Sequence, residues 1–178
     1  MLLAGREKDG LQIWSYHVNR GRSDEVLADN RAYPVLAAAA GMTGFGYWAY
    51  NVSSATTWDD TDGTILDYIF IYDGSEASPL NLKYNTEKER IVPSIRWEAV
   101  RAGQQDGQII VSLQEAVRSG KLPPPAREAV EAAIQKAQAL GGPELTGTSD
   151  LSFASLRELS GQLRQAYQQS VSEKPQGD

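Results

Sequence analysis

Aromatic side chains at the ends of predicted strands are the first residues whose types suggest chemistry. They are Trp14, Tyr16, Trp48, Tyr50 and, just beyond the second strand, Trp58. Glycoside hydrolysis commonly combines paired carboxylates with aromatic rings that stack on sugar faces. The nearest carboxylates, Asp59, Asp60 and Asp62, all fall in a polar loop and none falls on a strand. That placement is poor for a pre-organised acid or base, so exposed loop charges are the preferred interpretation.

The same acidic loop raises the question of metal binding. An EF-hand alignment on Gly63 would put Trp58, which has no oxygen to offer, at the first ligand position. The chain has no cysteine and His17 is its only histidine, which disfavours thiolate sites, a Ser-His-Asp triad and a multi-histidine metal site. We therefore expect no metal and no cofactor.

The overall composition sets the broad class of protein. A chain of 178 residues with 41% hydrophobic residues can form an ordinary globular core. The formal net charge of -6 argues against a nucleic-acid partner, which requires a basic surface. Because there is no run of about eighteen apolar residues and no apolar signal-peptide core, we expect no membrane partner. The cellular compartment is left open.

The elements that position the aromatic residues begin with a strand–helix–strand unit. Residues 11–18 and 43–52 are predicted strands, and a helix over residues 24–40 lies between them and stops at Gly41. Pro34 inside this helix predicts a kink or a later helix start. A crossover of this length makes the strands parallel and the connection right-handed. Since the second strand is apolar on both faces, both should be covered.

The rest of the chain reads as one β-rich segment followed by helices. Residues 64–72 predict a third strand, onto which residues 80–84 can pair back as a hairpin. A helical pattern then runs from Val92 to Gly120, with Pro93 in its first turn and a break expected near Gly107. Further helices are predicted over residues 126–140 and from Ser149 or Asp150 to about Val171.

The first of these helices carries a run of charged residues between Arg96 and Asp106. Glu98 can reach Arg101 at a three-residue helical step. Asp106 lies on the apolar stripe, so it should be paired, with an arginine as the natural partner. We interpret the run as a buried ion network that ties the helix to the sheet, in preference to a catalytic arrangement.

The segment Val92–Asp106 resembles a signature near the end of a bacterial family of glycoside-hydrolase-like barrels, long catalogued as a domain of unknown function. That family includes β-N-acetylgalactosaminidases. The strand Gly44–Asn51 resembles the family's glycine-x-x-tyrosine-tryptophan-alanine-x-asparagine strand, and Ile13–Tyr16 resembles the strand before it. The likeness spans roughly residues 10–120. Within the signature Arg96, Glu98, Arg101, Gly103 and Asp106 match, whereas Trp97, Ala102, Gln105 and Gly107 depart from the pattern.

The resemblance implies an α/β fold. Residues 1–120 would form the last strands and helices of a (β/α)8 TIM barrel with a β-rich insertion, and residues 121–178 a helical extension. In the family, the acid/base carboxylate and its neighbouring aspartate lie upstream, and nothing before Leu11 can host such a pair. The chain is therefore expected to be the C-terminal portion of a protein acting on N-acetylhexosaminide glycans, contributing sugar contacts without the catalytic carboxylates.

Trp48 and Asn51 carry over from the family as sugar contacts. The further sugar-contact candidates are Tyr50, Tyr16, Trp14 and Trp58, and the residues expected to give structural support are Arg96, Glu98, Arg101 and Asp106. The expected partners are a carbohydrate and either the missing barrel segment or a second copy of the chain. Two alternatives stay open: a stand-alone carbohydrate-binding or oligomerisation module without catalysis, and a degenerate domain with no ligand.

Overall fold

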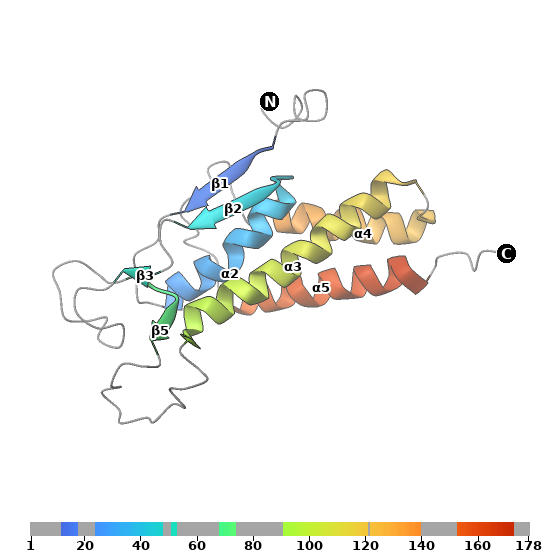
Figure 1. Cartoon of the computed structure of the whole chain (residues 1–178). Helices are drawn as coiled ribbons and strands as arrows, with labels where there is room; N and C mark the ends of the chain where they lie inside the picture. The colour runs from blue at the N-terminus through green and yellow to red at the C-terminus, as the bar shows by residue number, and fades with distance from the viewer. Residues whose placement is uncertain are drawn as a thin grey trace.

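The computed structural model places four helices beside short paired strands (Figure 1). It describes residues 12–17, 24–47, 51–52, 68–73, 91–120, 122–139 and 153–172. The strands are β1 (Trp14–His17), β2 (Gly44–Tyr47), β3 (Asn51–Val52), β4 (Tyr68–Ile69), β5 (Ile71–Asp73) and β6 (Ile91–Pro93). The helices are α2 (Asp24–Ala39), α3 (Ile95–Arg118), α4 (Pro124–Ala139) and α5 (Phe153–Ser172).

The predicted strand–helix–strand unit is confirmed. β1 and β2 pair in parallel, with Trp14 opposite Gly44 and Tyr16 opposite Gly46. The helix α2 connects them and ends where the sequence indicated. Gly41 has a φ of 74°, and the amides of Gly41 and Met42 donate to the carbonyls of Ala38 and Ala37, the pattern of a Schellman cap.

The predicted partial (β/α)8 barrel is wrong. Within the described residues the strands form three two-stranded sheets, and only β1–β2 is parallel. Both faces of the second strand were expected to be covered, and the four residues of β2 are half-buried. On the neighbouring β1, Trp14 and Tyr16 are 66% and 61% exposed. The third predicted strand corresponds to β4 and β5, and β5 pairs with β6. The proposed hairpin partner, residues 80–84, lies outside the described residues.

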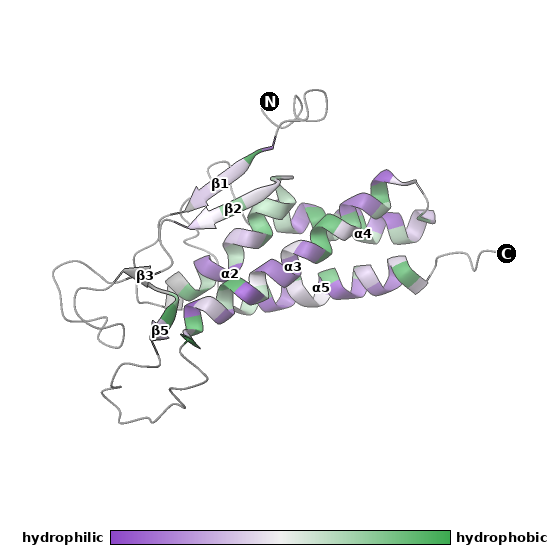
Figure 2. Cartoon of the chain, viewed as in Figure 1, coloured by the Kyte–Doolittle hydropathy of each residue, from purple (hydrophilic) through white to green (hydrophobic). Residues whose placement is uncertain are grey.

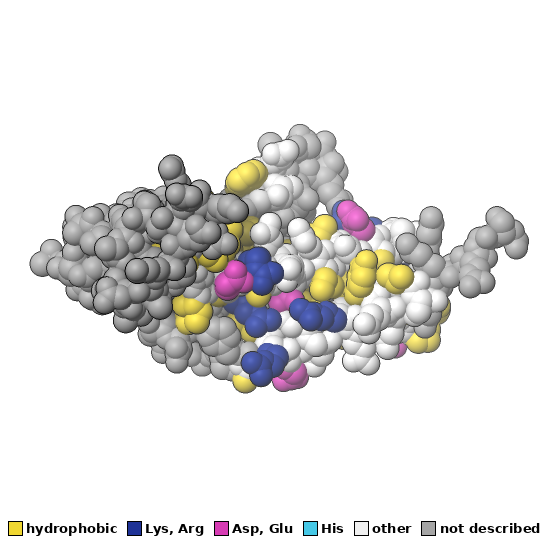
Figure 3. All heavy atoms as spheres, turned by 60° about the horizontal axis from the view of Figure 1, so that its bottom comes forward, with side chains coloured by type: hydrophobic (Ala, Val, Ile, Leu, Met, Phe, Trp, Pro, Cys, Tyr) yellow, Lys and Arg dark blue, Asp and Glu magenta, His cyan; other side chains and the backbone are white. Residues whose placement is uncertain are grey.

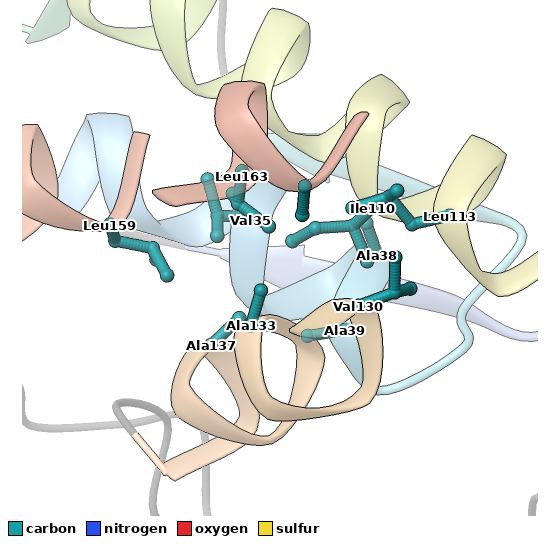
Figure 4. Close-up of a cluster of buried hydrophobic side chains, with 11 residues drawn as sticks. Val35, Ala38, Ala39, Ile110, Leu113, Val130, Ala133, Ala137, Leu159 and Leu163 are labelled. Carbon is teal, nitrogen blue, oxygen red and sulfur yellow. The ribbon is translucent and has the colours of Figure 1, made fainter. Parts of the chain in front are cut away.

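The core is built by helices packing on helices, which is why no barrel forms. Its largest cluster takes residues from α2, α3, α4 and α5, so helices on both sides of residue 120 share one interior. The side chains of Val35, Ile110, Leu113, Val130 and Leu163 point toward one another there (Figure 4). Apolar and polar segments alternate along α3, α4 and α5, as expected for helices that bury one side (Figure 2).

Pro34 does not divide α2, which runs unbroken from Asp24 to Ala39. A proline lacks the amide that would donate to the carbonyl four residues earlier, which here belongs to Asn30. The Tyr47 hydroxyl donates to that carbonyl instead, at 3.2 Å. The second strand thus supplies the hydrogen bond that the helix loses.

The predicted break in α3 near Gly107 does not occur. The helix continues to Arg118 and stops before Gly120, whose φ is 67°. Pro93 is not in its first turn but ends β6, and Ser94 caps the helix by accepting from the amide of Trp97 at 3.2 Å. Among the described helices, none combines the length and apolar character needed to cross a membrane.

Candidate ligand-binding pocket

The structure describes only some of the residues that the sequence predicts as sugar contacts. Trp48, Tyr50 and Trp58 lie outside the described residues, as do Asp59, Asp60 and Asp62. Asn51 belongs to β3, but its side chain is outside the description. Trp14 and Tyr16 project from the outer face of β1. The sugar contacts predicted at Trp48, Tyr50, Asn51 and Trp58 therefore stay predictions, and the aromatic surface described below is built from other residues.

An aromatic pocket lies between β2 and the first half of α3. Its volume is about 330 Å³, which is at the lower end of the range for small-molecule sites. We define the aromatic pocket by its lining: Phe45, Gly46, Tyr47, Phe70, Trp97, Val100, Arg101 and Gln104. The first half of α3 starts near β5 and passes beneath the end of β2 (Figure 1).

The aromatic rings of the pocket hold one another in place. Tyr47 meets Phe70 edge to face, with ring centroids 5.1 Å apart and planes at 75°. Phe70 in turn meets Trp97 at 6.5 Å and 69°. Phe70 is only 3% exposed, whereas Trp97 is 37% exposed. Trp97 is therefore the ring with the most surface left for a ligand, and the buried rings behind it fix its setting.

Backbone geometry explains why these rings converge. Phe45 and Tyr47 are two residues apart on β2, and side chains alternate between the faces of a strand, so these two share one face. That face packs against Tyr33 of α2, whose ring lies 5.9 Å from Phe45 and 5.5 Å from Tyr47. The amide of Ser94 donates to the carbonyl of Phe70 at 2.9 Å, which sets the start of α3 beside β5. Trp97 follows one turn later.

The polar rim of the pocket comes from α3. Arg101 and Gln104 lie four and seven residues beyond Trp97, so all three project from the same side of the helix. The Arg101 guanidinium donates to Glu98 at 2.7 Å, as the sequence predicted. Among the described residues that line the pocket, none is a carboxylate. The site therefore offers an aromatic surface, a guanidinium and an amide, with no acid or base pair.

The buried charge of α3 serves packing. Asp106 is 2% exposed and pairs with Arg31 of α2 at 3.2 Å, which confirms the predicted arginine partner. Ser160 of α5 donates to the same carboxylate oxygen and accepts from Arg31 at 2.7 Å. The network thus joins α3 to two other helices, whereas the prediction tied it to the sheet. Arg96, also predicted as support, is buried.

A hydrogen bond between two hydroxyl groups joins α2 to the inner face of β1. Tyr33 donates to Ser15 Oγ at 2.5 Å. Burial raises the pKa of the Tyr33 phenol above its ordinary value, while the Ser15 hydroxyl, which can also donate to a phenolate, opposes that rise.

In the described part of the chain, no three His, Cys, Asp or Glu side chains gather in a way that could hold a metal ion.

Part of the pocket follows from the sequence, because the glycine-rich aromatic strand that contains Phe45 and Tyr47 can form the floor of a ligand site. The sequence presents Trp97 only as a departure from the family signature and Phe70 only as a strand residue. A signal was present, because Trp97, Arg101 and Gln104 follow one another at four- and three-residue steps. Arg101 was predicted as structural support and lines the pocket as well.

Comparison with models of known protein families, with curated proteins and with solved structures finds no match to this chain. The resemblance to glycoside-hydrolase-like proteins therefore stays a prediction.

Proposed function

We propose that this chain binds carbohydrate without cleaving it, and that the aromatic pocket holds one sugar ring. The observation that carries the proposal is the joint presence of a partly exposed Trp97, the Arg101 guanidinium and the Gln104 amide around one hollow. Aromatic rings bind the apolar faces of sugars, and planar polar groups hydrogen-bond the hydroxyls at the ring edge.

The absence of a carboxylate from the described lining of the pocket favours binding over hydrolysis. Hydrolysis of a glycosidic bond commonly requires two carboxyl groups placed on either side of it. Glu98 is the nearest acid along α3, and its carboxylate is engaged with Arg101 at 2.7 Å. The ordered motifs that resemble those of N-acetylgalactosaminidases support N-acetylhexosamine as the first sugar to test.

The experiment is a ligand titration in which two-dimensional NMR spectra are recorded at each sugar concentration. N-acetylgalactosamine and N-acetylglucosamine are added to wild type, Trp97→Ala, Gln104→Ala and Tyr167→Ala. Tyr167 is a matched control, because it is an exposed aromatic residue on α5 that does not line the pocket. We expect saturable shifts at Gly46 and Arg101 in wild type and in Tyr167→Ala.

In Trp97→Ala the affinity should fall about tenfold, which corresponds to roughly 1.4 kcal/mol. Gln104→Ala should give a smaller loss, because it removes hydrogen bonds at an exposed rim. Circular dichroism establishes that each variant is folded. The proposal fails if wild type shows no saturable shift with either sugar, or if wild type and Trp97→Ala bind both sugars equally.

A further inference from the structure

We infer that the ligand is an oligosaccharide chain, because a second, larger hollow adjoins the aromatic pocket on the same side of α3. This inference rests on the proposed function and extends it. The second hollow, which we call the long groove, has a volume of about 710 Å³. Phe45 and Gln104 line both hollows, so the two lie next to each other along α3. Together they give a channel that one ring would leave mostly empty.

The floor of this channel is one stripe of α3. Trp97, Arg101, Gln104, Gln108 and Val111 recur at three- and four-residue steps and line one or both hollows. At about 1.5 Å per residue, the stripe extends for roughly 21 Å along the helix axis. Amide and guanidinium groups therefore recur along the channel, as repeated hydrogen bonding to successive sugar units requires.

The wall of the channel is formed by β2. Within the described residues this strand pairs with β1 alone. Gly46 lines the aromatic pocket and Gly44 lines the long groove. Neither residue has a side chain, so a ligand can approach the β2 backbone closely at both positions.

Trp14 supplies a second aromatic platform in the long groove. Its ring lies across Gly44, where an added Cβ would be 2.7 Å from two of the indole carbons. The ring therefore reaches from β1 over β2 to the groove, and it is still 66% exposed. Tyr16 projects from the same face two residues later and lines neither hollow. A tryptophan ring in each of two adjacent hollows suits a chain of sugar rings.

A polypeptide strand is the competing occupant of this channel. It could pair with β2, since exposed strand edges accept added strands. However, β2 spans only the four residues Gly44–Tyr47, which gives a short ladder. The amides and the two tryptophan platforms would add little to strand pairing, whereas both serve sugar binding. The observations therefore favour the glycan.

The test is a chain-length series measured by calorimetry with β-1,4-linked N-acetylglucosamine from the monosaccharide to the hexasaccharide. For wild type, we expect affinity to rise at least tenfold from monomer to hexamer. Trp14→Ala should reduce hexamer affinity to near the monomer value and leave monomer affinity unchanged. Tyr16→Ala, the matched control on the same strand face, should behave as wild type. Gly44→Ala, which displaces the Trp14 ring, should behave as Trp14→Ala.

The outcomes separate this inference from the proposed function. Monomer binding that does not strengthen with chain length would overturn the oligosaccharide inference and leave the single-sugar proposal standing. The same holds if Trp14→Ala binds the hexamer as wild type does. Absence of binding to every sugar would overturn both. Binding of an alternating Thr-Val hexapeptide in place of all the sugars would assign the channel to a polypeptide strand and also overturn both.

Discussion

Gly103 of α3 lies directly against the backbone of Arg31 in α2, and a Cβ added to Gly103 would be 2.0 Å from the Arg31 carbonyl oxygen. One turn later, a Cβ on Gly107 would be 3.0 Å from the carbonyl oxygen of Pro34. The two helices therefore meet main chain to main chain through a pair of glycines. This close approach is what brings α2 and α3 into one helical layer beneath β1 and β2 (Figure 1).

Gly103→Ala should be among the most damaging single substitutions in the chain. The methyl group would overlap a backbone oxygen, which cannot move aside as a flexible side chain can, so the helices must separate. Overpacking of this kind costs about 1–3 kcal/mol and occasionally more, and we expect the upper end of that range. Urea denaturation followed at 222 nm measures the loss.

Gly161→Ala is the matched control for that experiment. Gly161 lies within α5, and an added Cβ would meet nothing within 4 Å. Alanine has a higher helix propensity than glycine by up to about 1 kcal/mol, so this variant should be more stable than wild type. Equal stability of the two alanine variants would show that the α2–α3 contact is not as close as described.

The packing role of Gly103 and Gly107 could not be predicted from the sequence. Read along one helix, Gly103 and Gly107 lower helix propensity and predict a break. Their actual role depends on Arg31 and Pro34, more than seventy residues earlier, and no local pattern carries that pairing. The parallel β1–β2 pair was predictable, because apolar alternation and a helix-length crossover are local signals. The fold beyond this pair was not predictable in the same way. The barrel was inferred from the resemblance to a family, and no residues had been identified that could cover both faces of the strands.

The candidate site was predictable to a similar degree. The burial of Asp106 follows from its place on the apolar stripe of α3, and its need for a cation follows from elementary electrostatics. Which cation it meets depends on how three helices pack, so Arg31 and Ser160 could not be named in advance. Trp97 was visible in the sequence, but the rings behind it come from two separate strand regions.

Asp106→Ala should destabilise the fold by about 3 kcal/mol, because removing one partner of a buried pair leaves the other charge uncompensated. This loss is at the lower end of the roughly 3–5 kcal/mol that breaking a buried ion pair costs, because the Arg31 side chain keeps 18% of its surface exposed. The measurement is the free energy of unfolding at neutral pH. Ser160→Ala should cost less, because Arg31 and Asp106 remain paired.

Glu98→Gln provides the comparison for that prediction. It breaks an ion pair with Arg101 whose side chains are 46% and 53% exposed. Basic side chains gather in the middle of one face of the molecule with acidic ones among them, where water screens such pairs (Figure 3). The change in stability should stay within about 0.5 kcal/mol. A cost as large as that of Asp106→Ala would contradict the packing role assigned to the buried network.

Gly44→Ala should displace the Trp14 ring, because the new methyl group would lie 2.7 Å from the indole. The Trp14 indole resonances should shift in NMR spectra. Gly46→Ala is the control, since a Cβ there meets nothing within 4 Å. It should leave Trp14 unchanged and gain roughly 0.5 kcal/mol, because alanine loses less chain entropy than glycine on folding. Identical Trp14 spectra in both variants would refute the contact.

The stability of wild type should fall more steeply with alkaline pH than that of Tyr33→Phe. Burial raises the pKa of the Tyr33 phenol in the folded state above its ordinary value of 10.0. The neutral phenol therefore favours the folded state below pH 10, and this contribution is lost as pH rises through the unfolded pKa toward the folded one. Unfolding free energies measured between pH 8 and pH 11 test this difference.

At pH 8, Tyr33→Phe should be less stable than wild type by about 1 kcal/mol, because it loses the hydrogen bond to Ser15. That gap should narrow above pH 10. Ser15→Ala keeps the buried phenol and removes the hydroxyl that opposes the pKa rise, so its alkaline decline should be at least as steep as that of wild type. Parallel curves for wild type and Tyr33→Phe across this range would show that Tyr33 ionises no differently in the folded and unfolded chains.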